Sequence, residues 1–405
     1  MGRVSGPRVV VTAAASRLGA LVVAELERRP DVDTVVAVDA RPPAGPFARA
    51  EFVRLGEGLA QLPRVVQGAG AEVLVDLRAA AALTPLDERA LVAHGPVTER
   101  VGAAVLQDGS PVRRLVTVGS VHRFGWDRGL PAFVTETTDV PGRPRGSLAQ
   151  ALAEIERAAA AAAARRPDLA VTTVRLADAV GAAGAGLLGA ADRLPLLPTV
   201  LGFDPPVQVV HEEDAARAVA HVVARALQGP YLVAADGTLA LSEALSTLGR
   251  AHAPVLPPWG TGVLASVLAR AGVGAVHDLA GQLRRGRGID NRRLKATGFA
   301  YRSTSREALA TAGARGSRRV LHPGVPAPYE PEVEAFLRYS PSAVAPEPEP
   351  SRQAPDGVAA LDADDLLALL PSLDRTALTA LRAHEAAGPA RPRVLGEIDL
   401  LLRRG

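Results

Sequence analysis

One stretch near the N-terminus, residues 8–19, constrains the fold more than any other part of the chain. Its sequence is RVVVTAAASRLG, in which three consecutive valines lead through a short turn into the segment LGALVVAELERR. Consecutive β-branched residues favour a buried strand, and the apolar residues of the following segment recur with helical spacing. The stretch therefore predicts a strand, a tight turn and a helix.

A second buried strand is predicted about 20 residues beyond this turn, in VDTVVAVDAR, and it ends at Asp39. This order of elements is the βαβ unit that binds dinucleotides, with the acidic residue on the ribose hydroxyls. The turn departs from that pattern, because Ala13 and Ser16 stand where glycines are expected and only Gly19 is retained. A side chain at either position crowds the phosphates, and an alanine held at positive φ costs about 1 kcal/mol. The spacing thus predicts the fold, whereas the altered turn argues against its usual ligand.

Further strands and helices alternate along the chain. A continuous apolar run at residues 71–83 is predicted to be one buried strand, and the LVTV core of residues 112–125 and VTTVRL at 171–176 are predicted to be two more. Helices are predicted at residues 86–107 and in the alanine-rich segment SLAQALAEIERAAAAAAARR. This alternation predicts an α/β fold, a Rossmann-like doubly wound parallel sheet.

The chain of 405 residues is long enough for two or three domains. We expect a Rossmann-like dinucleotide-binding core at 1–176 and the remainder of that domain, with a small substrate-side subdomain, at 177–339. A proline-rich linker is predicted at 340–357 and a three-helix tail at 358–405. A tail of this size is marginally stable alone, so we expect it to dock on a protein partner or to form a homo-oligomer.

Composition excludes several classes of site. The chain has no cysteine, which excludes disulfides and thiolate metal sites and fits a cytoplasmic location. Its eight histidines show no ligand spacing, so no metal site is expected. No signal peptide and no membrane span are predicted. The net charge of +3 does not indicate nucleic-acid binding, and the basic cluster QLRRGRGIDNRRLK is expected to be a solvated face or a phosphate contact.

Five stretches in order, VVAVDAR, RRLVTVGSVHRFG, VVHEEDAARAVA, GPYLVAADGTLALSEAL and IDNRRLKATGFAYRSTSREAL, carry a resemblance to a known family. Over residues 8–315 the chain resembles the NAD-dependent epimerase/dehydratase family of extended short-chain dehydrogenases/reductases, in the form found in actinobacteria. The resemblance implies NAD as cofactor and a nucleotide or nucleotide-sugar ligand.

The same resemblance implies a site built on a serine, a tyrosine and a lysine. Ser120 matches the serine, but Gly146 and Gln150 stand at the tyrosine and lysine positions, and the chain has no tyrosine and no lysine before Tyr231. His122 lies next to the serine and is a candidate substitute, because an imidazole can act as an acid or base near neutrality. The alternative is that it is a loop histidine at the rim.

The cofactor side of the family site is altered as well. Arg78 stands where the family has a small residue, so that it either fills the space of a dinucleotide or offers its fork to a smaller phosphate. Asp39 favours NAD over NADP, unless it merely caps the turn. Gly56 and Val207 replace the family's adenine-binding aspartate and diphosphate-binding arginine. The candidate cofactor-binding residues are Thr12, Ala13, Ser16, Leu18, Gly19, Asp39, Arg41 and Arg78.

Three functions are compatible with this sequence. The first is a pseudoenzyme of the family, a nucleotide-binding or scaffold protein with little or no hydride transfer. The second is an active NAD-dependent nucleotide-sugar epimerase or reductase with a rearranged site that uses Ser120. The third is a partner-binding protein that acts through its C-terminal helical tail.

Overall fold

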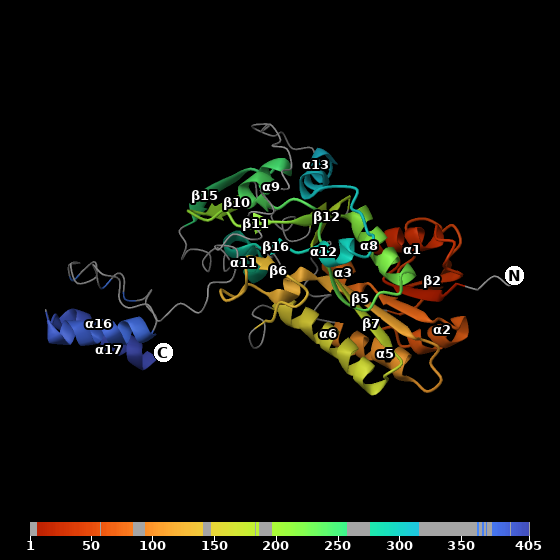
Figure 1. The fold of residues 1–405 in the computed structure, drawn as a ribbon, viewed down its shortest axis with the longest axis horizontal. Coiled ribbons are helices and arrows are strands. Elements are labelled where there is room, and N and C mark those ends of the chain that lie inside the picture. The colour runs from red at the N-terminus through yellow and green to blue at the C-terminus, as the bar shows by residue number, and fades with distance from the viewer. Residues whose placement is uncertain are drawn as a thin grey trace. The chain divides into compact units, whose positions relative to one another are not determined.

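A seven-stranded sheet forms the centre of the computed structural model (Figure 1). The chain divides into two compact units, Met1–Ala345 and Pro346–Gly405, and the sheet belongs to the first. The structure describes residues 6–56, 58–83, 94–140, 147–182, 184–185, 197–256, 276–315, 363, 367, 370, 375–388 and 390–404.

All seven strands of the sheet run parallel. The chain reverses its direction of travel across the sheet between β1 and β4, and ligands of open α/β sheets bind at such a switch point, beyond the carboxyl ends of the strands. The strands in spatial order are β13 (Gly229–Val233), β7 (Ala170–Leu176), β5 (Arg114–Ser120), β4 (Val73–Asp76), β1 (Arg8–Thr12), β2 (Thr34–Asp39) and β3 (Glu51–Arg54).

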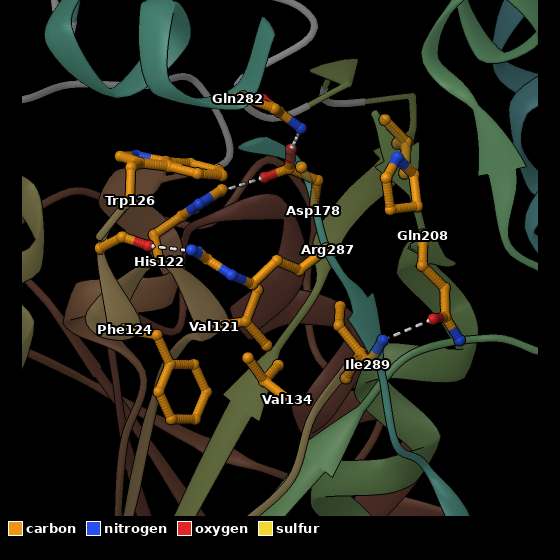
Figure 2. Close-up of a pocket in the computed structure, with 14 residues that line it drawn as sticks. Val121, His122, Phe124, Trp126, Val134, Asp178, Gln208, Gln282, Arg287 and Ile289 are labelled. Carbon is orange, nitrogen blue, oxygen red and sulfur yellow. Dashed lines mark hydrogen bonds and ion pairs between the residues drawn. The ribbon is translucent and has the colours of Figure 1, made fainter. Parts of the chain in front are cut away.

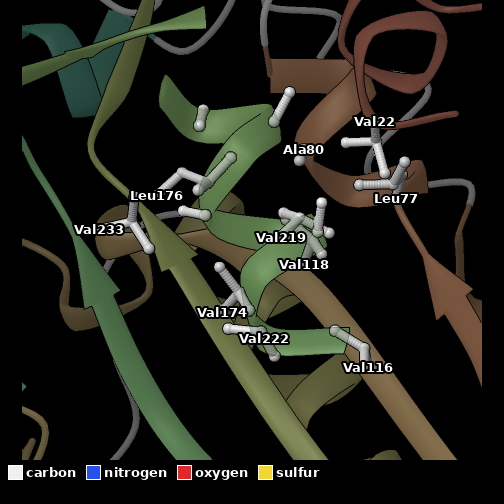
Figure 3. Close-up of a cluster of buried hydrophobic side chains, with 14 of the residues drawn as sticks. Val22, Leu77, Ala80, Val116, Val118, Val174, Leu176, Val219, Val222 and Val233 are labelled. Atoms are coloured by element: carbon white, nitrogen blue, oxygen red, sulfur yellow. The ribbon is translucent and has the colours of Figure 1, made fainter. Parts of the chain in front are cut away.

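Two layers of helices cover the sheet because successive strand side chains point to opposite faces. Val9 and Val11 belong to the apolar cluster under α1 (Arg17–Glu27) and α8 (Glu212–Ala224). Figure 3 shows Val219 and Val222 of α8 packed on the strand valines. Val10 belongs to the cluster on the opposite face. The helices of that face are α2 (Leu62–Ala69), α5 (His94–Leu106) and α6 (Ser147–Arg165).

The prediction of one strand over residues 71–83 is wrong in its second half. Strand β4 ends at Asp76, and α3 (Arg78–Leu83) follows directly. Its sequence RAAAAL is rich in alanine, the strongest helix former, whereas VLVD is rich in β-branched and apolar residues. The sheet also continues beyond residue 176, because β13 pairs with β7. The expected core boundary therefore falls inside the sheet domain.

Short elements, most of them after β7, accompany the large sheet. A second apolar cluster among them includes Val207, Leu245, Leu283 and Leu309, whereas Phe124, Val134 and Ile289 belong to the cluster on the sheet. The short strands pair in small sheets of two or three, and β6 and β16 join segments that are far apart in sequence. The strands are β6 (Phe133–Val134), β8 (Asp178–Gly181), β9 (Gly184–Ala185), β10 (Leu197–Val200), β11 (Pro206–Val207), β12 (Val209–His211), β14 (Leu239–Ala240), β15 (His252–Leu256) and β16 (Gly288–Ile289). The helices are the 3-10 helix η1 (Val121–Phe124), α9 (Leu241–Thr247), α11 (Val276–Arg285), α12 (Arg292–Lys295) and α13 (Ser305–Arg315).

The second unit contains α16 (Arg375–Ala387) and α17 (Pro392–Arg404). Leu378 and Leu381 pack with Val394 and Ile398 in a small core of its own. The first of the three predicted tail helices lies mostly outside the described residues, as does the predicted linker. Among the helices that the structure describes, none is both long and apolar enough to cross a membrane.

Candidate functional site

The turn after β1 adopts the conformation that normally requires glycine. Ala13 has φ of 52°, in the left-handed region. A Cβ atom at Gly19 would lie 2.1 Å from the carbonyl oxygen of Ala13, so the first turn of α1 packs against the chain only with glycine here. The turn therefore keeps the backbone geometry of a dinucleotide-binding unit although its first glycine is an alanine.

Ser16, at the second altered glycine position, is the N-cap of α1. Its Oγ accepts a hydrogen bond from the amide of Gly19 at 3.0 Å and donates one to the carbonyl oxygen of Ala13 at 2.7 Å. The side chain thus takes one of the free amide groups that a helix N-terminus would otherwise offer to an anion. Leu18 is buried in the apolar cluster on the sheet.

Asp39, at the end of β2, holds the turn in place. One carboxylate oxygen accepts the amide of Ala15 at 2.9 Å, and the other accepts the amide of Arg41 at 3.1 Å. Arg41 itself is exposed. Asp39 therefore caps the turn, as one of the two interpretations of the sequence expected. A bound ribose would have to share a carboxylate that already accepts two hydrogen bonds.

A buried ion pair lies at the ends of β1 and β4. Arg78 donates through Nε and one terminal nitrogen to the two carboxylate oxygens of Asp76, both at 2.7 Å, and Thr12 Oγ1 donates to the same carboxylate at 2.9 Å. Burial raises the pKa of Asp76, but the attraction and hydrogen bonds of Arg78 and the bond from Thr12 outweigh it, so its pKa is lowered. The fork of Arg78 is occupied by Asp76, and a phosphate would have to compete with that carboxylate.

A second ion pair links α1, which follows the β1 turn, to α8 and has no sequence signal. Arg17, the first residue of α1, donates to Oε1 of Glu212 at 2.8 and 3.0 Å. The Glu212 side chain is 3% exposed and packs so closely on Gly181 that a Cβ there would lie 2.3 Å from it. These residues are 195 positions apart, so only the fold brings them together.

The two candidate catalytic residues lie at the end of β5, next to the end of β7. Ser120, the last residue of β5, accepts the amide of His122 at 3.2 Å and so caps η1. Nε2 of His122 lies 2.7 Å from Oδ1 of Asp178, the first residue of β8. His122 is 5% exposed, and this excludes the alternative of a histidine at the rim. Asp178 was missed from the sequence, although a carboxylate directly after the buried strand VTTVRL was a usable signal.

His122 and Asp178 line a small pocket together with Gln282 of α11 (Figure 2). The pocket has a volume of about 40 Å³ and mostly apolar walls, among them Phe124, Trp126 and Ile289. Trp126 lies beside the His122 ring, with ring centroids 5.7 Å apart, and donates to Asp278 at 3.2 Å. A Cβ at Gly281 would lie 2.3 Å from the Trp126 ring. Helix α11 therefore fixes the wall of the pocket.

Electrostatics favour a protonated His122. Burial alone lowers its pKa, but the charge and hydrogen bond of Asp178 and the charge of Asp278 outweigh this effect, so the pKa is raised. Arg287 also lines the pocket, and its guanidinium donates to the carbonyl oxygens of Gly125 and Asp127. Burial and the neighbouring Arg285 lower the pKa of Arg287 to about 10, so it remains charged at neutral pH.

The sequence is similar to that of mycobacterial proteins. The chain is 32% identical over 273 residues to uncharacterized protein Rv0501 of Mycobacterium tuberculosis, covering 64% of this chain and 71% of that protein. Uncharacterized protein Mb0513 of Mycobacterium bovis matches equally well. The chain belongs to the same family as these proteins. No family model matches the sequence.

Solved structures that include an epimerase and a dehydratase have the same overall fold as this chain. UDP-glucose 4-epimerase from Thermotoga maritima, solved with UDP-glucose, covers 76% of this chain and 97% of its own, with a TM-score of 0.54 and 15% identity. Bordetella bronchiseptica WbmG, in complex with NAD and UDP, covers 78% of this chain and 95% of its own, with a TM-score of 0.54 and 17% identity. Human epimerase family protein SDR39U1, with NADPH, covers 76% of this chain and 99% of its own, with a TM-score of 0.53 and 20% identity.

Two of the three positions that the resemblance assigned to catalysis, those of the tyrosine and the lysine, lack the expected groups, whereas the serine is present as Ser120. Gln150 lies on α6, and Gly146 lies outside the described residues. Tyr231 is a buried residue of β13, and Lys295, the single lysine of the chain, pairs with Asp236 at 2.8 Å. Neither lines the pocket beside Asp178. Val207, at the diphosphate position, is buried in its apolar wall.

The basic cluster at 282–295 turns its cations toward groups of the protein itself. Arg285 donates to the carbonyl oxygen of Trp126 at 2.7 Å, Arg292 pairs with Asp290, and the guanidinium of Arg293 lies 4.8 Å from the ring centre of Tyr231. The Arg285 contact joins α11 to the segment after η1, and the Arg293 contact joins α12 to β13. Among the described residues, no group of three or more histidines and carboxylates could hold a metal ion.

Proposed function

We propose that the protein is a nucleotide-binding member of the epimerase/dehydratase fold that does not carry out tyrosine-dependent hydride transfer. The observation that carries this proposal is the set of residues at the carboxyl ends of β5 and β7. Ser120 is followed by the His122–Asp178 pair, and the chain has no tyrosine or lysine before Tyr231 that could stand beside the serine. Without a lysine to hold the ribose and lower the tyrosine pKa, the usual proton transfer has no carrier.

Nucleotide binding is supported by the retained backbone of the β1 turn and by Asp39. The structural neighbours include proteins with NAD, NADPH, UDP or UDP-glucose. NAD is the cofactor we expect, since a carboxylate at the end of β2 suits ribose hydroxyls and repels a 2′-phosphate. The altered turn and the Asp76–Arg78 pair should make this binding weaker than in an active enzyme.

Calorimetric titration of the purified chain with NAD, NADP and UDP-glucose tests the proposal. We expect weak binding of NAD, lost in Asp39→Asn but kept in Asp33→Asn, a matched change at an exposed aspartate of the same region. An NMR assay of UDP-glucose epimerisation should show no turnover. Micromolar NAD affinity together with turnover would overturn the proposal, and absence of any nucleotide binding would overturn its first half.

An active enzyme with a rearranged site is the second candidate. The observation that favours it is the buried pair of His122 and Asp178, 2.7 Å apart, directly after Ser120. In this case Ser120 would bind the reacting oxygen and His122 would exchange its proton. Cofactor carried through purification and released on denaturation would support it, provided that Ser120→Ala abolishes turnover while Ser110→Ala, at another buried serine, does not.

Partner binding through the tail is a third candidate. The observation that favours it is that α16 and α17 form a unit of their own with a small core, on which Leu400 is left exposed. A unit of this size is marginally stable alone and gains stability from a protein partner or a second copy of the chain. Light scattering of the full chain and of a chain ending at residue 339 tests it, because an equal protomer number for both would refute self-association through the tail.

A further inference from the structure

We propose that the site at the β1 turn binds an uncharged ribonucleoside and discriminates against its phosphates. Because this is the site of the proposed function, the inference rests on that function and specifies the class of its ligand. The carboxyl edge at β1, β2 and β4 keeps a carboxylate suited to a ribose, whereas the groups suited to a diphosphate are crowded or already bonded within the chain. The diphosphate of a dinucleotide therefore does not fit the residues present.

The backbone amides of the β1 turn are largely used by the chain itself. A glycine-rich turn holds phosphates because its amides are free and no side chain stands in front of them. Here four amides of residues 14–19 already have acceptors, and Ser16 stands where glycine lets a phosphate approach the first amides of α1. The bonded amides are those of Ala14, to Val38 O at 3.2 Å, Ala15, to Asp39 at 2.9 Å, Ser16, to Ala13 O at 3.1 Å, and Gly19, to Ser16 Oγ at 3.0 Å.

Two arginines beside the turn are bound to carboxylates of the chain. Arg17, the first residue of α1, pairs with Glu212 at 2.8 Å, and Arg78, directly after β4, pairs with Asp76 at 2.7 Å. Nη1 of Arg78 has no partner within the described residues, but this atom is buried and its guanidinium is neutralised by Asp76. Each pair is neutral as a whole, so neither supplies the positive charge that favours a phosphate.

Asp39, at the end of β2, is the group that suits a ribose. It accepts the amides of Ala15 and Arg41, and a carboxylate has about four acceptor sites, so about two remain for hydroxyls. A carboxylate accepts hydroxyl protons and repels phosphate oxygens. The exposed Arg41 and Arg54 belong to the β2–β3 end of the edge rather than to the turn. The residues present thus favour the sugar of a nucleotide over its phosphates.

Binding of nucleosides with and without phosphates tests this preference on the intact chain. The probes are adenosine, guanosine, cytidine and uridine, their 5′-diphosphates and their 2′-deoxy forms, measured by ligand-observed NMR. We expect the best-bound nucleoside to bind at least as tightly as its diphosphate, whereas a turn that cradles phosphates would favour the diphosphate by at least about tenfold. The matching 2′-deoxynucleoside should bind about threefold to tenfold more weakly, because Asp39 loses a hydroxyl partner.

Two variants should restore phosphate binding. Ser16→Gly opens the approach to the first amides of α1 and should raise the affinity for the diphosphate about tenfold, with the nucleoside unchanged. Ser16→Ala keeps the Cβ and should not. Glu212→Gln releases Arg17 and should raise the diphosphate affinity about threefold to tenfold. Its control is Glu213→Gln, at the neighbouring exposed position, which changes the net charge equally and should have no effect.

The outcomes separate this preference from nucleotide binding as such. A diphosphate that binds the wild-type chain at least about tenfold more tightly than its nucleoside would overturn the inference and leave the proposed nucleotide binding intact. A nucleoside that binds while the diphosphates and NAD do not would support the inference and overturn nucleotide binding. If no probe and no NAD binds, both fail. Unchanged diphosphate affinity in both Ser16→Gly and Glu212→Gln would also overturn the inference.

Discussion

The two halves of the sheet's carboxyl edge use their polar groups differently. At the β1–β4 half, Ser16, Asp39 and Asp76 bond to neighbouring groups of the chain itself. At the β5–β7 half, His122 and Gln282 line one pocket, and each keeps an atom that no described residue pairs with. The first half is thus stabilised by contacts that a cofactor would have to displace, although Nη1 of Arg78 is also unpaired within the described part. The second half presents groups that a ligand could complete.

The largest expected effect comes from breaking the ion pair of the first half. Arg78→Ala leaves Asp76 buried without its partner, so we expect the free energy of unfolding to fall by about 3–5 kcal/mol in urea denaturation at neutral pH. The control, Arg41→Ala at an exposed site, should change it by less than about 0.5 kcal/mol. A stable Arg78→Ala protein that gains tight NAD binding would contradict this comparison, because Arg78 would then only have blocked a working cofactor site.

Asp178→Asn tests the second half through its pH dependence. The raised pKa of His122 means that the pair stabilises the fold fully below about pH 6.5, and that this contribution is lost as the pH rises through the folded-state pKa. We expect the variant to lose about 1.5–3 kcal/mol of unfolding free energy at about pH 6 and less at about pH 9. Urea denaturation across this range measures it, with the exposed Asp33→Asn as control. A loss that is the same at every pH would show that His122 is not charged.

Ser16→Ala removes the N-cap of α1. Losing the hydrogen bond to the Gly19 amide should cost about 1 kcal/mol of stability in thermal or urea unfolding. Ser16→Gly should cost only a few tenths, because glycine is tolerated at this position, while it frees the amide for an anion. A gain of NAD affinity in Ser16→Gly that is absent in Ser16→Ala would indicate that the Ser16 hydrogen bond to Gly19 weakens NAD binding at the β1–β4 half.

Ala13→Gly gives the smallest expected effect. Glycine relieves the strain of φ at 52° but adds freedom to the unfolded chain, so we expect a net gain of about 0.5 kcal/mol. Ala226→Gly is the matched control, because Ala226 has φ of 49° and lies at the far end of α8. Similar gains in stability, with a change in NAD affinity for Ala13→Gly alone, would tie the altered turn to the ligand. A destabilised Ala13→Gly protein would contradict the strain argument.

Local sequence patterns predicted the elements that local physics controls. The valine run and helical periodicity of residues 8–27 correspond to β1 and α1, and the alanine-rich segment corresponds to α6. The same reasoning failed at residues 78–83. A short apolar run is compatible with a buried strand and with a buried helix, and only the high helix propensity of alanine distinguished the two. Asp39 could be placed at the end of β2, but its bonds to Ala15 and Arg41 could not be foreseen.

The sequence by itself determined the parallel α/β sheet, the altered β1 turn and the lack of a tyrosine and a lysine in the part of the chain that would carry catalysis. Only the tertiary structure decided which charged groups meet. His122 and Asp178 are 56 positions apart, and Arg17 and Glu212 are 195 apart. The physical reason is that periodicity and spacing report contacts within one element, whereas an ion pair between elements depends on how the strands are ordered in the sheet. The altered β1 turn could thus be seen in the sequence, whereas the bonds that Ser16, Asp39 and Asp76 make around it could be seen only in the structure.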